Sequence, residues 1–303
     1  MMHNALRVLW TTQRQFVFPV TMYLANTVRR LIARSSTMST MTAVAAPGVS
    51  TSPDAFSRLR RYNIGLGFIH LAQAVAMLVL SNGFTLPVWR SFLSGPPGTA
   101  PTSEPWFDVP LGPLVAAFLL FASLDHFLMA APKINNWYNG MLANQRNDAR
   151  WIEYSISASL MMVLIAMICG VTDFGALVAI AGVNSCMIFF GLMQEVFTKP
   201  GKGVNWMPYI FGCFAGAIPW AIVAIQIASA EERAIDGGVP GFVYGIIISL
   251  FLFFNTFSVN MVLQYKQVGK WKDYLYGEKV YLLMSLIAKT ILAWQVFANV
   301  LVP

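Results

Sequence analysis

Seven long apolar stretches follow one another along the chain, separated by shorter polar segments. They cover residues 62–81, 111–131, 151–170, 174–193, 206–228, 240–264 and 280–301. Each is close to the twenty or so apolar residues that a helix needs to cross the hydrocarbon core of a bilayer. The pattern therefore predicts an all-α membrane protein, a seven-transmembrane-helix bundle spanning residues 58–303, with no room for a second globular domain.

The remaining segments are distinct in composition. Residues 1–57 form a leader rich in Arg, Ser and Thr, and no Asp or Glu precedes Asp54. Such a leader is typical of an organellar transit peptide, but it also fits a disordered cytoplasmic tail, or translation that truly starts at Met38 or Met41. The longest loop, 82–110, contains Gly95-Pro96-Pro97-Gly98, and we expect it to form a short hairpin.

Composition supports the membrane assignment and narrows the chemistry. Hydrophobic residues make up 57% of the chain and charged residues 11%, whereas a soluble domain carries about a quarter charged residues. Cys169, Cys186 and Cys213 lie within the apolar stretches without CxxC spacing, so we expect small core residues rather than disulfides or ligands. Without an HxxxH or HExxH pair, a metal site is not expected.

The positive charge is distributed unequally between the two sides of the predicted bundle. With seven helices, 17 of the 20 Lys and Arg residues fall on the side of the N-terminus, and only Arg90 and Arg233 fall on the other. The positive-inside rule then predicts a cytoplasmic N-terminus and an extracellular C-terminus. The net charge of +7 is explained by this asymmetry and does not indicate nucleic-acid binding.

One cation, Lys289, lies in the middle of the last apolar stretch. An ionisable side chain at that depth is costly without a partner or a function. A buried lysine is also the residue type that condenses with aldehydes to form a Schiff base. Lys289 is therefore the leading candidate for a functional residue.

Glu153 is the predicted partner of Lys289. Lys289 lies about 18 Å along its helix from Gly277. If the third helix starts near Gly140, Glu153 lies about 20 Å along it, at a similar depth. If that helix starts at Trp151 instead, Glu153 is only an interfacial residue.

Further polar residues lie near this pair in the predicted helices. Ser285 and Ser157 are each four residues from a charged partner and share its helix face. His70 and His126 fall in the cytoplasmic half, which together with the Lys–Glu pair favours a proton-handling cluster over histidines that only pack. Aromatic residues on the last three helices, among them Trp220 and Trp294, favour either packing or a pocket for an extended polyene.

The chain resembles the retinal-binding microbial rhodopsins, and its motifs are similar to those of the heliorhodopsin branch over residues 58–303. The motifs are Arg150-Trp151-Ile152-Glu153-Tyr154-Ser155, Ser94-Gly95-Pro96-Pro97-Gly98-Thr99, Val239-Pro240-Gly241-Phe242-Val243-Tyr244-Gly245, Phe253-Phe254-Asn255, Ser285-Leu286-Ile287-Ala288-Lys289 and Ala293-Trp294-Gln295.

This resemblance implies specific roles. All-trans retinal would be bound to Lys289 as a protonated Schiff base, with Glu153 as its counterion. His70 and His126 match histidines that accept or relay the Schiff-base proton, and Ser285 matches the hydroxyl beside it.

The resemblance also concerns the pocket and the assembly. Phe254 and Met187 match pocket positions, and the family has a cytoplasmic N-terminus and forms dimers. Asp125, beside His126, departs from the pattern, in which that position is apolar. We therefore assign Asp125 no role from the sequence.

The positions of the titratable residues relative to Lys289 distinguish a proton pump from a light sensor. No Asp, Glu or His lies between the level of Lys289 and the outer surface, so a proton leaving the Schiff base has acceptors on the cytoplasmic side alone. We predict a light sensor, not an enzyme, that signals to an unknown cytoplasmic or membrane partner. It would reside in the plasma membrane, or in an organelle membrane if the leader is a transit peptide.

Two alternatives remain open at the level of sequence. The first is a light-gated proton channel or a weak light-driven proton transporter. The second is a seven-helix receptor or hydrolase in which Lys289 and Glu153 form a structural pair.

Overall fold

The computed structural model describes residue 48 and residues 53–201, 203–233 and 238–303. The chain divides into two units, residues 1–44 and 45–303, and all described residues belong to the second. The predicted leader therefore lies outside the described residues, except for residue 48 and the helical residues that follow position 52.

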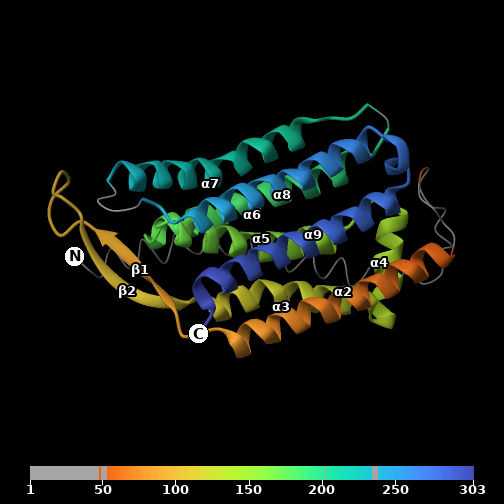
Figure 1. Cartoon of the computed structure of the whole chain (residues 1–303). Helices are drawn as coiled ribbons and strands as arrows, with labels where there is room; N and C mark the ends of the chain where they lie inside the picture. The colour runs from red at the N-terminus through yellow and green to blue at the C-terminus, as the bar shows by residue number, and fades with distance from the viewer. Residues whose placement is uncertain (1–47, 49–52, 202, 234–237) are drawn as a thin grey trace, which may run out of the picture. The chain divides into compact units, whose positions relative to one another are not determined.

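Seven helices among the described residues are long and apolar enough to cross a membrane, which confirms the predicted number (Figure 1). They are α2 (Pro53–Leu80), α3 (Leu111–Ala130), α5 (Asp148–Ile168), α6 (Phe174–Phe197), α7 (Met207–Glu232), α8 (Gly241–Tyr265) and α9 (Tyr274–Val296). A 3-10 turn, η2 (Gly269–Lys272), precedes α9, and a π-helical turn, η3 (Phe297–Leu301), follows it.

The helices pack mainly on their neighbours in sequence: α2 on α3, α5 on α6, α6 on α7 and α8 on α9, while α3 also packs on α5. The largest apolar core lies where α5 and α9 end and where α3 and α8 begin. Leu119, Leu164, Leu250 and Leu292 are completely buried there. This half of the bundle is therefore tightly packed with hydrocarbon.

The loop between α2 and α3 contains two antiparallel strands, β1 (Thr85–Phe92) and β2 (Thr102–Pro110), at one end of the bundle (Figure 1). Trp89 N–H donates to the carbonyl of Thr172 at 2.9 Å, which ties β1 to the segment before α6. The strands thus lie within the loop for which the sequence predicts a hairpin.

A short helix, α4 (Pro132–Ala143), runs across the opposite end of the bundle (Figure 1). The third membrane helix, α5, begins after it at Asp148, so both predicted starts, near Gly140 and at Trp151, are wrong. Gln145 has a φ of 53°, which ends the preceding helical path. The side chain of Asn147 then accepts a hydrogen bond from Arg150 N–H and caps α5.

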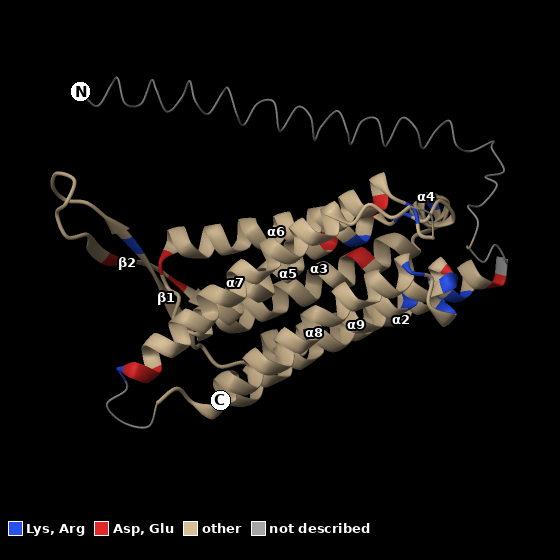
Figure 2. Ribbon diagram, turned by 90° about the horizontal axis from the view of Figure 1, so that it is seen from above, with Lys and Arg blue, Asp and Glu red and all other residues tan. Residues whose placement is uncertain are grey.

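Lys and Arg residues gather around α4 and the first turns of α2, as Figure 2 shows. They include Arg58, Arg60 and Arg61 on α2 and Lys133 on α4. At the opposite end, Arg90 pairs with Glu104 on the hairpin. The asymmetry of charge deduced from the sequence is therefore present in the folded bundle.

Candidate functional site

Lys289 on α9 and Glu153 on α5 lie together in the interior. The Lys289 side chain is 4% exposed and that of Glu153 is 7% exposed, and Nζ lies 3.4 Å from Glu153 Oε1. Nζ also donates a shorter hydrogen bond, 2.7 Å, to Ser285 Oγ, one helical turn earlier. The ammonium lies 5.1 Å from the centre of the Tyr154 ring. The structure thus surrounds one buried cation with a carboxylate, a hydroxyl and an aromatic face.

The two charged residues meet for a reason that differs from the predicted one. Because α5 starts at Asp148, Glu153 is about 8 Å along α5, whereas Lys289 is about 22 Å along α9. The first turn of α5 lies inside the protein, where Asn147 and Arg150 are 2% and 3% exposed. Glu153 is therefore buried close to the start of its helix.

A cavity of about 310 Å³ reaches Lys289. Large flat side chains make up much of its wall, from α5, α7, α8 and α9. These are Trp151, Tyr154, Tyr209, Trp220, Phe251, Phe254, Phe257 and Tyr281. The Trp220 ring stands edge-on to Phe251 and Phe254, with ring centres 5.3 and 5.7 Å apart. An apolar cavity that contains one primary amine fits an elongated apolar aldehyde.

Three of the four pocket residues predicted from the sequence line this cavity, and the fourth does not. Phe254, Met187 and Trp220 line the cavity, but Trp294 does not. Trp294 is 39% exposed and packs edge-on against Phe297. It follows Lys289 by five residues, about 140° around the helix, so its side chain points away from the amine.

The two histidines stack on one another, with ring centres 5.4 Å apart and planes 10° apart. His126 lines a second, smaller cavity together with Glu153 and Ser285, whereas His70 lines neither cavity. Both ring nitrogens of His70, and the hydroxyl of Ser157, are buried without a hydrogen-bond partner in the described structure. Ser157 therefore makes no hydrogen bond to the Lys289 pair in this structure.

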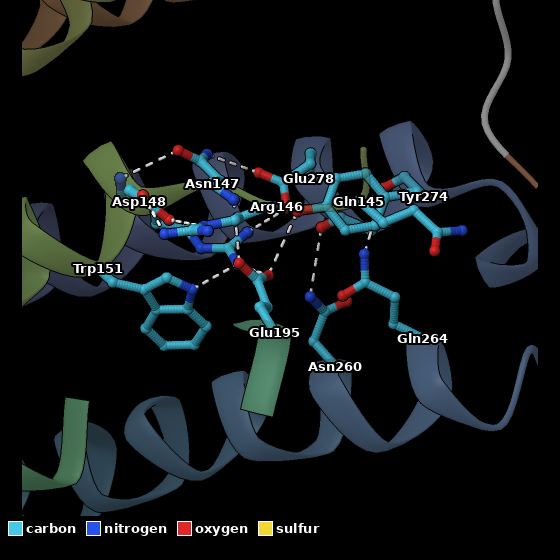
Figure 3. Close-up of polar contacts among 12 residues, drawn as sticks. Gln145, Arg146, Asn147, Asp148, Trp151, Glu195, Asn260, Gln264, Tyr274 and Glu278 are labelled. Atoms are coloured by element: carbon cyan, nitrogen blue, oxygen red, sulfur yellow. Dashed lines mark hydrogen bonds and ion pairs between the residues drawn. The ribbon is translucent and has the colours of Figure 1, made fainter. Parts of the chain in front are cut away.

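A buried ionic cluster that hydropathy does not reveal adjoins this site, since Arg150 lines the same small cavity as Glu153. Figure 3 shows the polar contacts of this cluster. Arg150 pairs with Glu195 on α6 and with Glu278 on α9. Asn147 Nδ2 donates to Glu278 at 2.8 Å, and Trp151 Nε1 donates to Glu195 at 2.7 Å. The cluster joins α5, α6 and α9. Both glutamates fall just outside the apolar stretches 174–193 and 280–301, so hydropathy alone places them at the membrane surface.

Comparisons with known proteins agree with this geometry. The profile of the heliorhodopsin family matches residues 59–301. No curated protein matches the chain. Among solved structures, the crystal structure of the light-driven proton pump LR (Mac) from Leptosphaeria maculans is similar, with a TM-score of 0.55 and 14% identity. The match covers 83% of this chain and 98% of that one, and at this identity it shows a common fold alone. Because the family profile spans nearly the whole helical bundle, the chain belongs to the heliorhodopsin family.

Proposed function

We propose that the protein is a light sensor that holds all-trans retinal on Lys289 and transports no ion across the membrane. Membership of the family implies a retinal chromophore in a multi-pass membrane protein. Retinal attached to Lys289 would supply the absorption of visible light and a double bond that isomerises. The observation that carries the sensor proposal is the absence of Asp, Glu and His from the stretches of α5 and of α9 with η3 that lie on the outer side of Lys289.

The cavity supports Lys289 as the attachment point. Lys289 is the only lysine among the described residues that line it. The neighbouring aromatic rings from α7 and α8 offer flat apolar contact surfaces. Ser285 accepts a hydrogen bond from the amine and orients it.

Glu153 is suited to be the counterion. A protonated imine in an apolar site loses its proton unless a negative charge lies near it. Glu153 Oε1 lies 3.4 Å from Lys289 Nζ. At the effective dielectric constant of a protein interior, the Coulomb attraction between two opposite unit charges at this distance is roughly 5 kcal/mol. The buried Arg150 cluster lies beside Glu153 on α5 and fixes the first turn of that helix.

Glu153→Gln is expected to move the absorption band to longer wavelength, since loss of the negative charge destabilises the ground state of the cation more than its excited state. Glu232→Gln, at the exposed end of α7, is the matched control and is expected to leave the band in place. Absorption spectra of retinal-reconstituted protein measure both. An unchanged band in Glu153→Gln would exclude Glu153 as the counterion.

The outer half of the bundle supports a photocycle without transport. From Ala158 to Ile168 on α5 and from Thr290 to Leu301 there is no Asp, Glu or His. Most of the side chains there belong to the largest apolar core, and the Thr290 hydroxyl is buried without a partner in the described structure. His126 and Glu153 lie on the other side. A proton that leaves the amine toward them can only return by the same route.

The charge distribution supports a cytoplasmic N-terminus, because Lys and Arg gather at the end of the bundle that carries α4 (Figure 2). The histidines then lie toward the cytoplasm. We further propose that the protein forms a homodimer in the bilayer and passes its signal to a cytoplasmic or membrane partner.

Photocurrents test the absence of transport. In voltage-clamped cells that express the protein and are supplied with retinal, light is expected to produce no steady current at any holding potential. A brief transient that integrates to zero is compatible with a proton that moves and returns. A steady or voltage-dependent current would instead establish a light-gated proton channel or a weak pump.

A further inference from the structure

Asp125 on α3 lines the small cavity beside the Lys289 pair. The cavity measures about 10 Å³, which is room for about one water molecule. It is lined by Asn63, Asp125, His126, Tyr138, Asn147, Arg150, Glu153, Tyr154, Leu282 and Ser285. Glu153 and Ser285, which contact the Lys289 amine, therefore share one water-sized space with a second carboxyl group.

His126, next to Asp125, is held in one orientation. Asn63 Nδ2 donates to the carbonyl of Leu59 at 3.1 Å, so its Oδ1 faces His126 Nδ1 at 2.9 Å. An amide oxygen only accepts hydrogen bonds, so Nδ1 must carry a hydrogen. In the neutral ring, Nε2 then has the free lone pair. His126 can take up a proton at Nε2 without breaking its bond to Asn63.

The charges around Asp125 leave it without a cation of its own. Lys289 pairs with Glu153, and Arg150 pairs with Glu195 and Glu278. Two cations therefore face three carboxylates before Asp125 is counted. No ion pair or hydrogen bond joins Asp125 to another side chain within the described ranges.

The remaining groups that face Asp125 do not supply a positive charge to balance it. They are Tyr154 on α5, Tyr138 on α4, and His126 with His70 stacked on it from α2. Burial, reinforced by the charge of Glu278, raises the pKa of Tyr138 above its ordinary value, so this hydroxyl stays protonated and neutral. Asp125 is partly buried, and a fourth ionised carboxylate would stand there without a compensating cation, which binding a proton avoids.

We propose that Asp125 is a second titratable carboxyl group of the chromophore site, one that holds a proton while Glu153 is ionised. The proposal rests on the proposed function. As the pH rises, the Asp125 carboxyl releases its proton to solvent, and a second negative charge then faces the Lys289 cation. That charge stabilises the ground state of the cation, so the absorption band moves to shorter wavelength.

The test is a pH titration of the absorption band in retinal-reconstituted protein, from about pH 4 to about pH 9, a range that spans ordinary carboxyl and imidazole values. Wild type is expected to show one reversible shift to shorter wavelength with rising pH. Asp125→Asn is expected to abolish this shift and keep the long-wavelength band, and Asp125→Glu to retain it with a different midpoint. Asp108→Asn, an equivalent change on the exposed hairpin, should titrate as wild type does.

The proposal is overturned if the wild-type absorption band does not shift with pH. It is also overturned if the band of Asp125→Asn shifts as that of wild type does, a result that would assign the transition to His126 or Glu153. Infrared spectra of protein labelled with ¹³C in the aspartate carboxyl group give a second readout when wild type is compared with Asp125→Asn, because exposed aspartates also bind protons at about pH 4. Wild type should show a protonated carboxyl band that carries the isotope shift, disappears as the pH rises and is missing from Asp125→Asn. Identical bands in the two proteins would also overturn the proposal. This readout works without retinal, so failure to form any visible band would count against the proposed function alone.

Discussion

Lys289→Ala is expected to give a purified protein that forms no visible absorption band when retinal is added. The reason is that Lys289 is the one amine, among the described residues, that lines the aromatic cavity. Lys270→Ala, an exposed lysine on η2, is the matched control and is expected to form the wild-type band. The measurement is the visible spectrum after addition of all-trans retinal.

The absence of a visible band in Lys289→Ala must be distinguished from misfolding, because the substitution leaves Glu153 buried without its cation. Lys289→Gly provides this separation. When supplied with a preformed imine of retinal and a short alkylamine, the glycine variant is expected to regain a visible band, since the cavity and Glu153 are intact. A visible band in Lys289→Ala with retinal alone would exclude Lys289 as the attachment point.

Arg150→Met is expected to destabilise the bundle by about 3–5 kcal/mol, the cost of removing one partner from a buried ion pair. The substitution leaves Glu195 and Glu278 facing one another without a cation, although each keeps a hydrogen bond from Trp151 or Asn147. Thermal loss of the visible band, compared with wild type in the same detergent, measures the effect. The expected result is a much lower midpoint temperature.

Arg146→Met is the matched control for this cluster. Arg146 lies close to Arg150 in the sequence and pairs with Asp148, but the Arg146 side chain is 39% exposed. An ion pair that reaches solvent contributes at most about 1 kcal/mol, so a small shift in midpoint is expected. Equal shifts in the two variants would show that the Arg150 cluster does not hold α5, α6 and α9 together.

The arrangement of the helices follows directly from hydropathy, because a bilayer requires about twenty apolar residues per helix whatever the tertiary packing. The same rule makes Lys289 conspicuous, since a charge inside such a stretch is costly. Glu153 does not follow from hydropathy in the same way. A helix start near Gly140 predicts a depth similar to that of Lys289, yet α5 starts at Asp148, and Glu153 is buried because the first turn of α5 lies inside the protein.

Several features of the site depend on tertiary packing that hydropathy does not encode. Glu195 and Glu278 occupy helix ends that appear solvated until Arg150 is seen between them. Trp294 is near Lys289 in sequence but about 140° around α9 from it. Asp125 points about 100° away from His126 on an ideal helix, but both line one small cavity, because α2, α4, α5 and α9 close around that end of α3.

Covalent attachment of retinal to Lys289, opposite Glu153, is the claim on which this account depends, and peptide mass spectrometry after reduction measures it most directly. Borohydride reduction of the retinal-loaded protein fixes retinal on the amine that holds it. The account predicts a retinyl group on the peptide that contains Lys289 and on no other lysine peptide. A retinyl group on a different lysine, or an unmodified Lys289 peptide from protein that shows the visible band, would contradict it.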